Sequence, residues 1–149
     1  MRSPQDERAR KIALFFLFSL ADERVALHAA HKAIAQFKAS SNESAKIDAE
    51  TIKALRKIYE KHKGQLHRES IANAVPPSSW NLPAGVSANA WLRFHKNSSE
   101  QEIVALVLSK ILALDEDDVA QGLGVSPGTV RYRVGKALRQ LGSFTEKEV

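Results

Sequence analysis

Four basic side chains lie close together near the end of the chain, in a stretch without an acidic residue. The stretch covers residues 126–141, and its basic residues are Arg131, Arg133, Lys136 and Arg139. Guanidinium and ammonium groups bind phosphate oxygens, and they also donate hydrogen bonds to base edges of duplex DNA. These residue types therefore predict binding of a polyanion rather than bond-breaking chemistry.

A histidine pair is the second pattern with chemical potential. His28 and His31 are three residues apart, so on a helix they share a face and could hold a metal if carboxylates converged on them. No Glu-x-x-His or His-Glu-x-x-His sequence accompanies them, and His62 and His67 lie elsewhere. A glycine-rich phosphate loop and a nucleophile-base spacing are also missing. We therefore predict exposed helix histidines, with no catalysis, cofactor or metal site.

Composition narrows the class of protein. The 149 residues fit one domain or two small ones, and a 44% apolar content is enough for a core. Without cysteine the chain has no disulfide, thiolate nucleophile or cysteine-bound metal, and gives no sign of an oxidising compartment.

The net charge of +5 fits a polyanionic partner or an ordinary solvated surface. Its distribution is more informative than the sum. Residues 99–125 contain six acids and one lysine, whereas residues 126–149 contain five basic residues and two acids. The charge that could bind a polyanion is therefore local.

The first helix is predicted from Ser3, a cap followed by Pro4, to about Leu20. Its apolar run, residues 12–21, follows basic residues and imitates a signal peptide. Asp6 and Glu7 dilute that basic leader, and about ten residues are too few to span a bilayer. We therefore predict a buried helix, covered on most sides, and no membrane association.

Two further helices are predicted in the N-terminal part. Asp22 caps the second, whose inner stripe is formed by Ala26, Ala30, Ala33 and Phe37, widened by Leu27 and Ile34. The third runs from Asp48 to about Leu66. It is basic and amphipathic, and its cations form either a solvated face or a nucleic-acid contact: Lys53, Arg56, Lys57, Lys61 and Lys63.

Proline and glycine mark the predicted domain boundary. Residues 75–87 contain Pro76, Pro77, Pro83 and Gly85, which cannot continue a helix. Trp80 is expected to anchor this linker on a domain surface. A short helix from about Ala88 to His95 should then bury its large side chains, Trp91, Leu92 and Phe94. The predicted organisation is an N-terminal helical domain at 1–75, a linker with this short helix at 76–97, and a C-terminal domain at 98–149.

The C-terminal domain carries the signals of three helices. Ser99 and Glu102 have the spacing of a capping box, and the helix that they begin carries an apolar stripe to Leu114. Asp115 can cap the next helix, and Gly124 permits the left-handed backbone that ends it. Ser126 followed by proline begins another helix. A short helix, a tight turn and a longer helix are typical of a helix-turn-helix.

The last helix has two different sides at about 100° per residue. One side is predicted to pack inward and carries Val130, Val134, Ala137, Leu138 and Leu141. The other carries Gly128, Thr129, Tyr132, Gly135, Lys136 and Arg139, with Arg131 and Arg133 on its flanks. This arrangement suits a helix in the major groove, with outer side chains at base edges and flanking arginines at phosphates. Because the acids lie on the preceding helix, we expect them to be kept off this surface.

Residues 114–141, LDEDDVAQGLGVSPGTVRYRVGKALRQL, closely resemble region 4 of bacterial RNA polymerase sigma factors, especially the extracytoplasmic-function type. The family pattern is leucine, an acidic pair, Ile/Val-Ala, Leu-Gly-Val/Ile-Ser, Gly-Thr-Val-Lys/Arg and a basic C-terminal half. The positions that match it in unbroken register include Asp117, Val119, Leu123, Gly128 and Arg131. The resemblance covers residues 99–141, and LuxR-type regulators share a looser version.

The resemblance implies an all-α fold, with an N-terminal helical bundle and a C-terminal helix-turn-helix of the sigma region 4 type. It also implies binding of the −35 promoter element, and contact with RNA polymerase core and an anti-sigma-type regulator. The expected DNA contacts are Ser126, Thr129, Arg131, Tyr132, Arg133, Lys136 and Arg139. The expected protein is a cytoplasmic bacterial transcription factor of undetermined oligomeric state.

The N-terminal part is only faintly similar to sigma region 2. Where that family has Asp-Leu-Val-Gln, this chain has Leu27-His28-Ala29-Ala30, and the promoter-melting stretch is not recognisable. A degenerate sigma-like regulator is therefore weighed against an autonomous initiator. The rival interpretation is a protein-interaction module that regulates a partner protein without binding DNA. The structure can discriminate between them: if the outer face of residues 128–139 packs against the N-terminal half, free DNA binding requires a conformational change.

Overall fold

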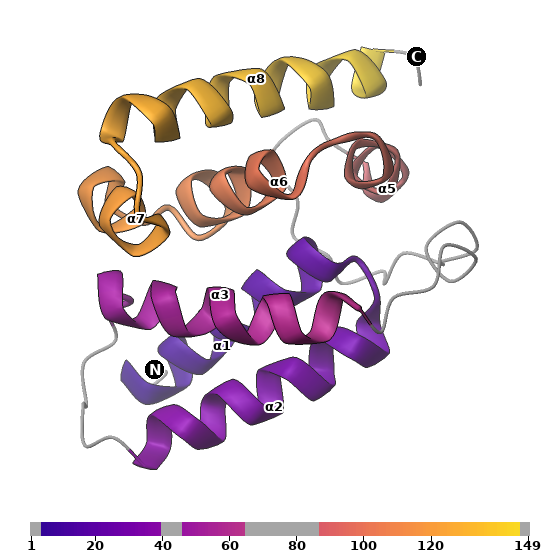
Figure 1. Cartoon of the computed structure of the whole chain (residues 1–149). Coiled ribbons are helices and arrows are strands. Elements are labelled where there is room, and N and C mark those ends of the chain that lie inside the picture. The colour runs from indigo at the N-terminus through magenta and orange to yellow at the C-terminus, as the bar shows by residue number, and fades with distance from the viewer. Residues whose placement is uncertain (1–3, 40–45, 65–86, 147–149) are drawn as a thin grey trace.

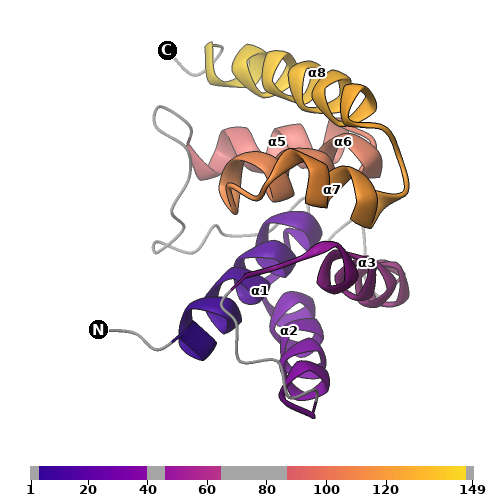
Figure 2. The ribbon, with the colours of Figure 1, turned by 90° about the vertical axis from the view of Figure 1, so that its left-hand side faces the viewer.

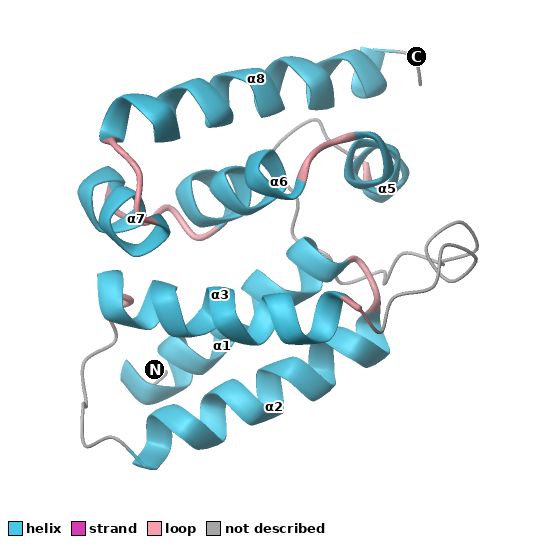
Figure 3. Ribbon diagram, in the orientation of Figure 1, coloured by secondary structure: helices cyan, strands magenta, loops and turns pink. Residues whose placement is uncertain are grey.

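The computed structural model describes residues 4–39, 46–64 and 87–146, and every element within these ranges is helical (Figure 3). The predicted all-α class is confirmed. The N-terminal half, residues 4–64, contains three helices, and the C-terminal half, residues 87–146, contains the others. Residues 66, 67 and 80, on which predictions were made, lie outside the described residues. Within these ranges no helix combines the length and apolar character needed to cross a membrane.

Helices α1 (Pro4–Leu20), α2 (Glu23–Ala39) and α3 (Ala49–Lys63) form the lower part of the molecule in Figure 1. The predicted cap Asp22 is confirmed, and Asp48, where the third helix was predicted to begin, also acts as a cap. Asp22 Oδ1 accepts from the Val25 amide at 3.1 Å, and Asp48 Oδ1 accepts from the Thr51 amide at 2.9 Å. Each cap satisfies an amide that the first turn of a helix leaves without an internal partner.

Aromatic side chains of α1 pack against small side chains of α2. Phe15, Phe16 and Phe18 are fully buried, and Ala26, Ala29, Ala30 and Ala33 let the α2 backbone approach closely. The prediction that Leu27 widens this stripe is wrong, because its side chain is 53% exposed. Leu27 directly follows Ala26, which places it about 100° farther round the helix and beyond the contact.

The C-terminal half contains α5 (Ala88–Asn97), α6 (Glu100–Leu106), the π-helical segment η1 (Val107–Ile111), α7 (Glu116–Leu123) and α8 (Pro127–Glu146). In Figures 1 and 2, α5, α6 and α7 form a middle layer and α8 lies above it. Ser99 caps α6 as predicted, accepting from the Glu102 amide at 3.3 Å. The wider turn of η1 was not predicted from the regular apolar stripe.

One hydrophobic core runs through both halves. Trp91 of α5 is fully buried, and its indole nitrogen donates to the Phe18 carbonyl at 3.1 Å. On the other side of the molecule, α3 packs against α7 so closely that Gly122 has no room for a side chain. A Cβ there would lie 2.5 Å from Ile52 Cγ2 and 3.1 Å from the Ala49 carbonyl oxygen. The N-terminal half therefore contacts the C-terminal half through α7, η1, α6 and α5, below α8.

Candidate nucleic-acid interface

The turn between α7 and α8 is built by local hydrogen bonds. Asp115 begins α7 by accepting from the Asp117 amide at 2.8 Å. Gly124 ends it with φ +71°, in the left-handed region that glycine adopts without a Cβ clash. The Val125 amide then donates back to the Ala120 carbonyl at 3.0 Å, which closes the helix end. These contacts fix the direction in which α8 leaves the turn.

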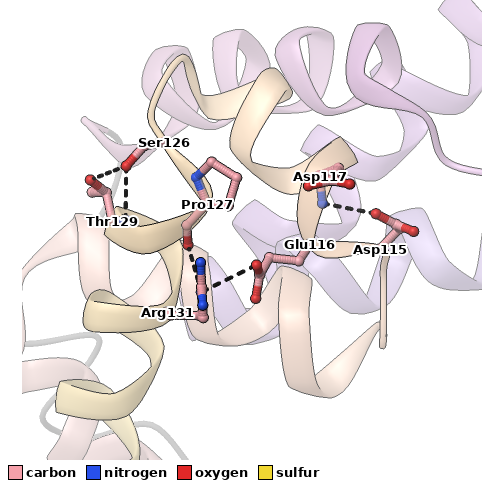
Figure 4. Close-up of polar contacts among 7 residues, drawn as sticks. All are labelled: Asp115, Glu116, Asp117, Ser126, Pro127, Thr129 and Arg131. Atoms are coloured by element: carbon pink, nitrogen blue, oxygen red, sulfur yellow. Dashed lines mark hydrogen bonds and ion pairs between the residues drawn. The ribbon is translucent and has the colours of Figure 1, made fainter.

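Ser126 and Thr129 meet at the start of α8 (Figure 4). Ser126 Oγ accepts from the Thr129 amide at 3.1 Å, and the two hydroxyl oxygens lie 2.9 Å apart. Ser126 is therefore the predicted helix cap. Both hydroxyls lie at the end of α8 where its first amides carry partial positive charge, a position suited to a phosphate oxygen.

The inner face of α8 matches the wheel prediction at four positions. Val130, Val134, Ala137 and Leu141 are buried against the preceding helices. Leu138 was also assigned to this face, and that prediction is wrong, because its side chain is 43% exposed. It follows Ala137 directly and lies about 100° round the helix from it, at the edge of the packed stripe.

The outer face of α8 is open to solvent. Tyr132 is 65% exposed, and Arg131, Lys136 and Arg139 are exposed beside it. The N-terminal half lies on the other side of α7, so it does not cover these side chains (Figures 1 and 2). The outer face of residues 128–139 is therefore not packed against the N-terminal half, and free DNA binding does not require a conformational change to expose it.

Two of the four cations are paired with acids of the preceding helices. Arg131 Nε lies 3.3 Å from Glu116 Oε1 (Figure 4), and Lys136 Nζ lies 3.1 Å from Glu102 Oε1. The hydrogen bond that Lys136 donates to the Glu102 carboxylate raises the pKa of Lys136 above its ordinary value. The expectation that acids are kept off this surface is therefore wrong for Glu102 and Glu116. Both reach it because the flanks of α8 lie directly over α6 and α7.

Arg133 is separated from the other predicted DNA contacts. It is half-buried and faces a cavity of about 130 Å³ where α3, α6, α7 and α8 meet. This cavity is called the seam cavity below, and its lining is Arg56, Tyr59, Glu60, Glu100, Gln101, Val104, Leu123 and Arg133. The structure thus brings Tyr132, Lys136 and Arg139 onto one open face and turns Arg133 towards the N-terminal half.

Two residues that matter here were not singled out from the sequence. Glu102 was recognised only as part of a capping box, although its carboxylate holds Lys136. No role was predicted for Gly122, although it permits the contact with α3. Glycine inside a helix costs roughly 1 kcal/mol relative to alanine, so its presence in α7 was a usable signal of close packing.

The histidine pair does not form a ligand cluster. His28 and His31 are both exposed on α2, and the His28 ring lies 5.7 Å from the His62 ring of α3. Within residues 4–39, 46–64 and 87–146, no group of three metal-ligating side chains comes together.

In the arrangement of its two halves, the chain has the fold of a sigma factor. It is similar to the sigma factor RpoE in a co-crystal structure with the anti-sigma factor NepR from Bartonella quintana. The TM-score is 0.71 and the sequence identity 15%, over 93% of this chain and 92% of that chain. No protein-family model and no curated protein matches the sequence. The likeness includes the N-terminal half, where the sequence resemblance to region 2 was faint.

Proposed function

We propose that the protein is a non-catalytic, sigma-like transcription factor that binds duplex promoter DNA through α8. The observation that carries the proposal is the open outer face of α8, where Tyr132, Lys136 and Arg139 are exposed in a stretch without acids. A helix in the major groove places such side chains at base edges, while its flanks reach phosphates. A cytoplasmic location follows from this function.

Six of the seven predicted contacts have a role in this proposal. Tyr132 lies centrally and is assigned to a base edge, whereas Arg131, Lys136 and Arg139 are assigned to phosphates. Ser126 and Thr129 are assigned to a phosphate at the start of α8. DNA contact by Arg133 stays a prediction, since its side chain faces the seam cavity.

Salt dependence tests the proposal. Three basic phosphate contacts, or four when Arg133 also contacts DNA, should give a slope of roughly −3 to −4 when log affinity is plotted against log salt, because phosphate contacts release counterions. Fluorescence anisotropy with a duplex oligonucleotide measures it. The double variant Arg131→Ala, Lys136→Ala should bind more weakly and lower the slope by roughly 2. A slope near zero, or an unchanged double variant, would contradict DNA binding.

A second function is favoured by the ion pairs of Arg131 and Lys136, which already neutralise part of the surface. In it, the chain binds RNA polymerase core or an anti-sigma-type regulator, as the similar RpoE was solved with an anti-sigma factor. Co-purification with purified polymerase core tests the first partner. Binding to polymerase core without any salt-dependent DNA affinity would favour this second function over promoter-DNA binding.

A further inference from the structure

The seam cavity is lined from both halves of the chain. Arg56 and Tyr59 come from α3, whereas Val104 comes from α6, Leu123 from α7 and Arg133 from α8. Its volume is about 130 Å³. This is enough for one small anion and too little for a drug-sized ligand.

Lys63 offsets one of the two negative charges of the carboxylates at the cavity, so three cations (Arg56, Arg133 and Lys63) and two acids (Glu60 and Glu100) leave a net charge of +1. Lys63 Nζ lies 2.6 Å from Glu60 Oε2 and 2.8 Å from Glu100 Oε2, so one ammonium group holds both acids. Neither carboxylate forms an ion pair with an arginine at the cavity in the described part of the chain. The two acids in the lining therefore do not fully compensate the charge of the three cations.

Both guanidinium groups keep unused hydrogen-bond donors. Arg56 Nη1 donates to the Leu123 carbonyl at 3.0 Å, a neutral acceptor that positions the group without cancelling its charge. Arg133 has no ion-pair partner among residues 4–39, 46–64 and 87–146. A guanidinium carries five N–H donors, and two neighbouring ones suit the oxygens of a phosphate or carboxylate.

Tyr59 adds a neutral donor to the same lining. Its side chain is buried, and this burial raises the pKa of the Tyr59 phenol well above its usual range. The hydroxyl therefore stays protonated at neutral pH and can donate to an anion without repelling it.

We propose that the seam cavity binds a small oxyanion, a phosphate or carboxylate group, between Arg56 of α3 and Arg133 of α8. The proposal is independent of DNA binding by the outer face of α8. Because the two arginines belong to different halves, a bound oxyanion stabilises the packing of the N-terminal half on the C-terminal half. A ligand that binds only the folded arrangement raises its stability by mass action.

Thermal unfolding of the full chain tests the site with two probes, inorganic phosphate and succinate, titrated at constant ionic strength and pH. At a concentration ten times the Kd, a bound probe shifts the folding equilibrium about 11-fold, which raises Tm by roughly 3 to 6 °C. The rise should saturate for at least one probe. A response to phosphate alone identifies a phosphate site, and a response to succinate alone a carboxylate site.

The variants Arg56→Ala and Arg133→Ala should each remove the saturable part of the rise, whatever their own starting Tm. Arg24→Ala is the matched control, because Arg24 is exposed on α2 and is absent from the cavity lining. Arg56→Lys separates charge from geometry and should weaken binding without abolishing it. No saturable rise with either probe, or a rise that both alanine variants retain, would overturn the proposal.

Discussion

Glu102 is placed where an acid opposes binding of a polyanion. Its side chain is only 10% exposed, at the first turn of α6, and its carboxylate is 3.1 Å from Lys136 Nζ. A phosphate that contacts Lys136 must compete with this internal partner. The ion pair also restricts the flexible Lys136 side chain, so its ammonium group has one preferred direction.

Removing the Glu102 charge should therefore strengthen DNA binding. We expect Glu102→Gln to raise affinity several-fold at low salt and to steepen the log-log slope by up to about 1, because Lys136 then meets phosphate without an internal counterion. Anisotropy titrations at several salt concentrations measure both quantities. Glu23→Gln is the control, since this acid is exposed on α2 in the N-terminal half and is absent from the seam cavity. Equal effects of the two substitutions would show that only net charge matters.

At the scale of elements, the contact between α3 and α7 depends on one missing side chain. Gly122→Ala places a methyl group within 2.5 Å of Ile52 Cγ2 and 3.1 Å of the Ala49 carbonyl oxygen. We expect a loss of about 1 to 3 kcal/mol in the free energy of unfolding, as for other overpacked sites. Urea denaturation monitored by circular dichroism measures it.

Two further variants make the α3–α7 prediction specific. Gly142→Ala, in α8, has open space around its new methyl group and should stabilise the chain by about 0.5 to 1 kcal/mol through helix propensity. Combining Gly122→Ala with Ile52→Gly should cost less than the sum of the single changes, since loss of the whole Ile52 side chain removes both clashing atoms, Cβ and Cγ2. If the changes in the free energy of unfolding are strictly additive, Gly122 is not required for the packing of α3 against α7.

The helix starts were predictable from sequence because capping chemistry is local. Asp48 and Asp115 each accept from an amide two or three residues ahead, so the cap and its partner appear together in the sequence. The η1 segment and the approach of Gly122 to Ile52 depend on which helix packs opposite, which one sequence does not specify. For the same reason, the basic residues of α8 were predictable and their partners Glu102 and Glu116 were not.

For the whole molecule, His95 lies where the two halves meet. Its Nε2 is 2.6 Å from the Ser19 carbonyl oxygen, and its Nδ1 is buried without a hydrogen-bond partner among the described residues. Burial lowers the pKa of His95, although the Ser19 carbonyl and Glu100 oppose this shift. The folded chain therefore binds a proton at His95 less readily than the unfolded chain does.

Stability should accordingly fall as the pH drops below about 6.5, the pKa of an unfolded-state histidine, and level off below the lowered pKa of the folded state. The slope from this group is at most about 1.4 kcal/mol per pH unit. Denaturant unfolding between pH 7.5 and 5 measures it, and His95→Gln should flatten the dependence. His31→Gln, an exposed control on α2, should leave it unchanged. An equally steep fall in the His95 variant would refute this assignment.

The hydrogen bond from Arg56 to the Leu123 carbonyl joins the N-terminal half to the last residue of α7, directly before the Gly124 turn that directs α8. An anion that draws Arg56 into the seam cavity acts on the same bond. Any change that this makes in the affinity of α8 for DNA must be reciprocal, so bound DNA would change the affinity for the anion by the same factor. A single guanidinium thus gives the two proposed sites a route for thermodynamic coupling.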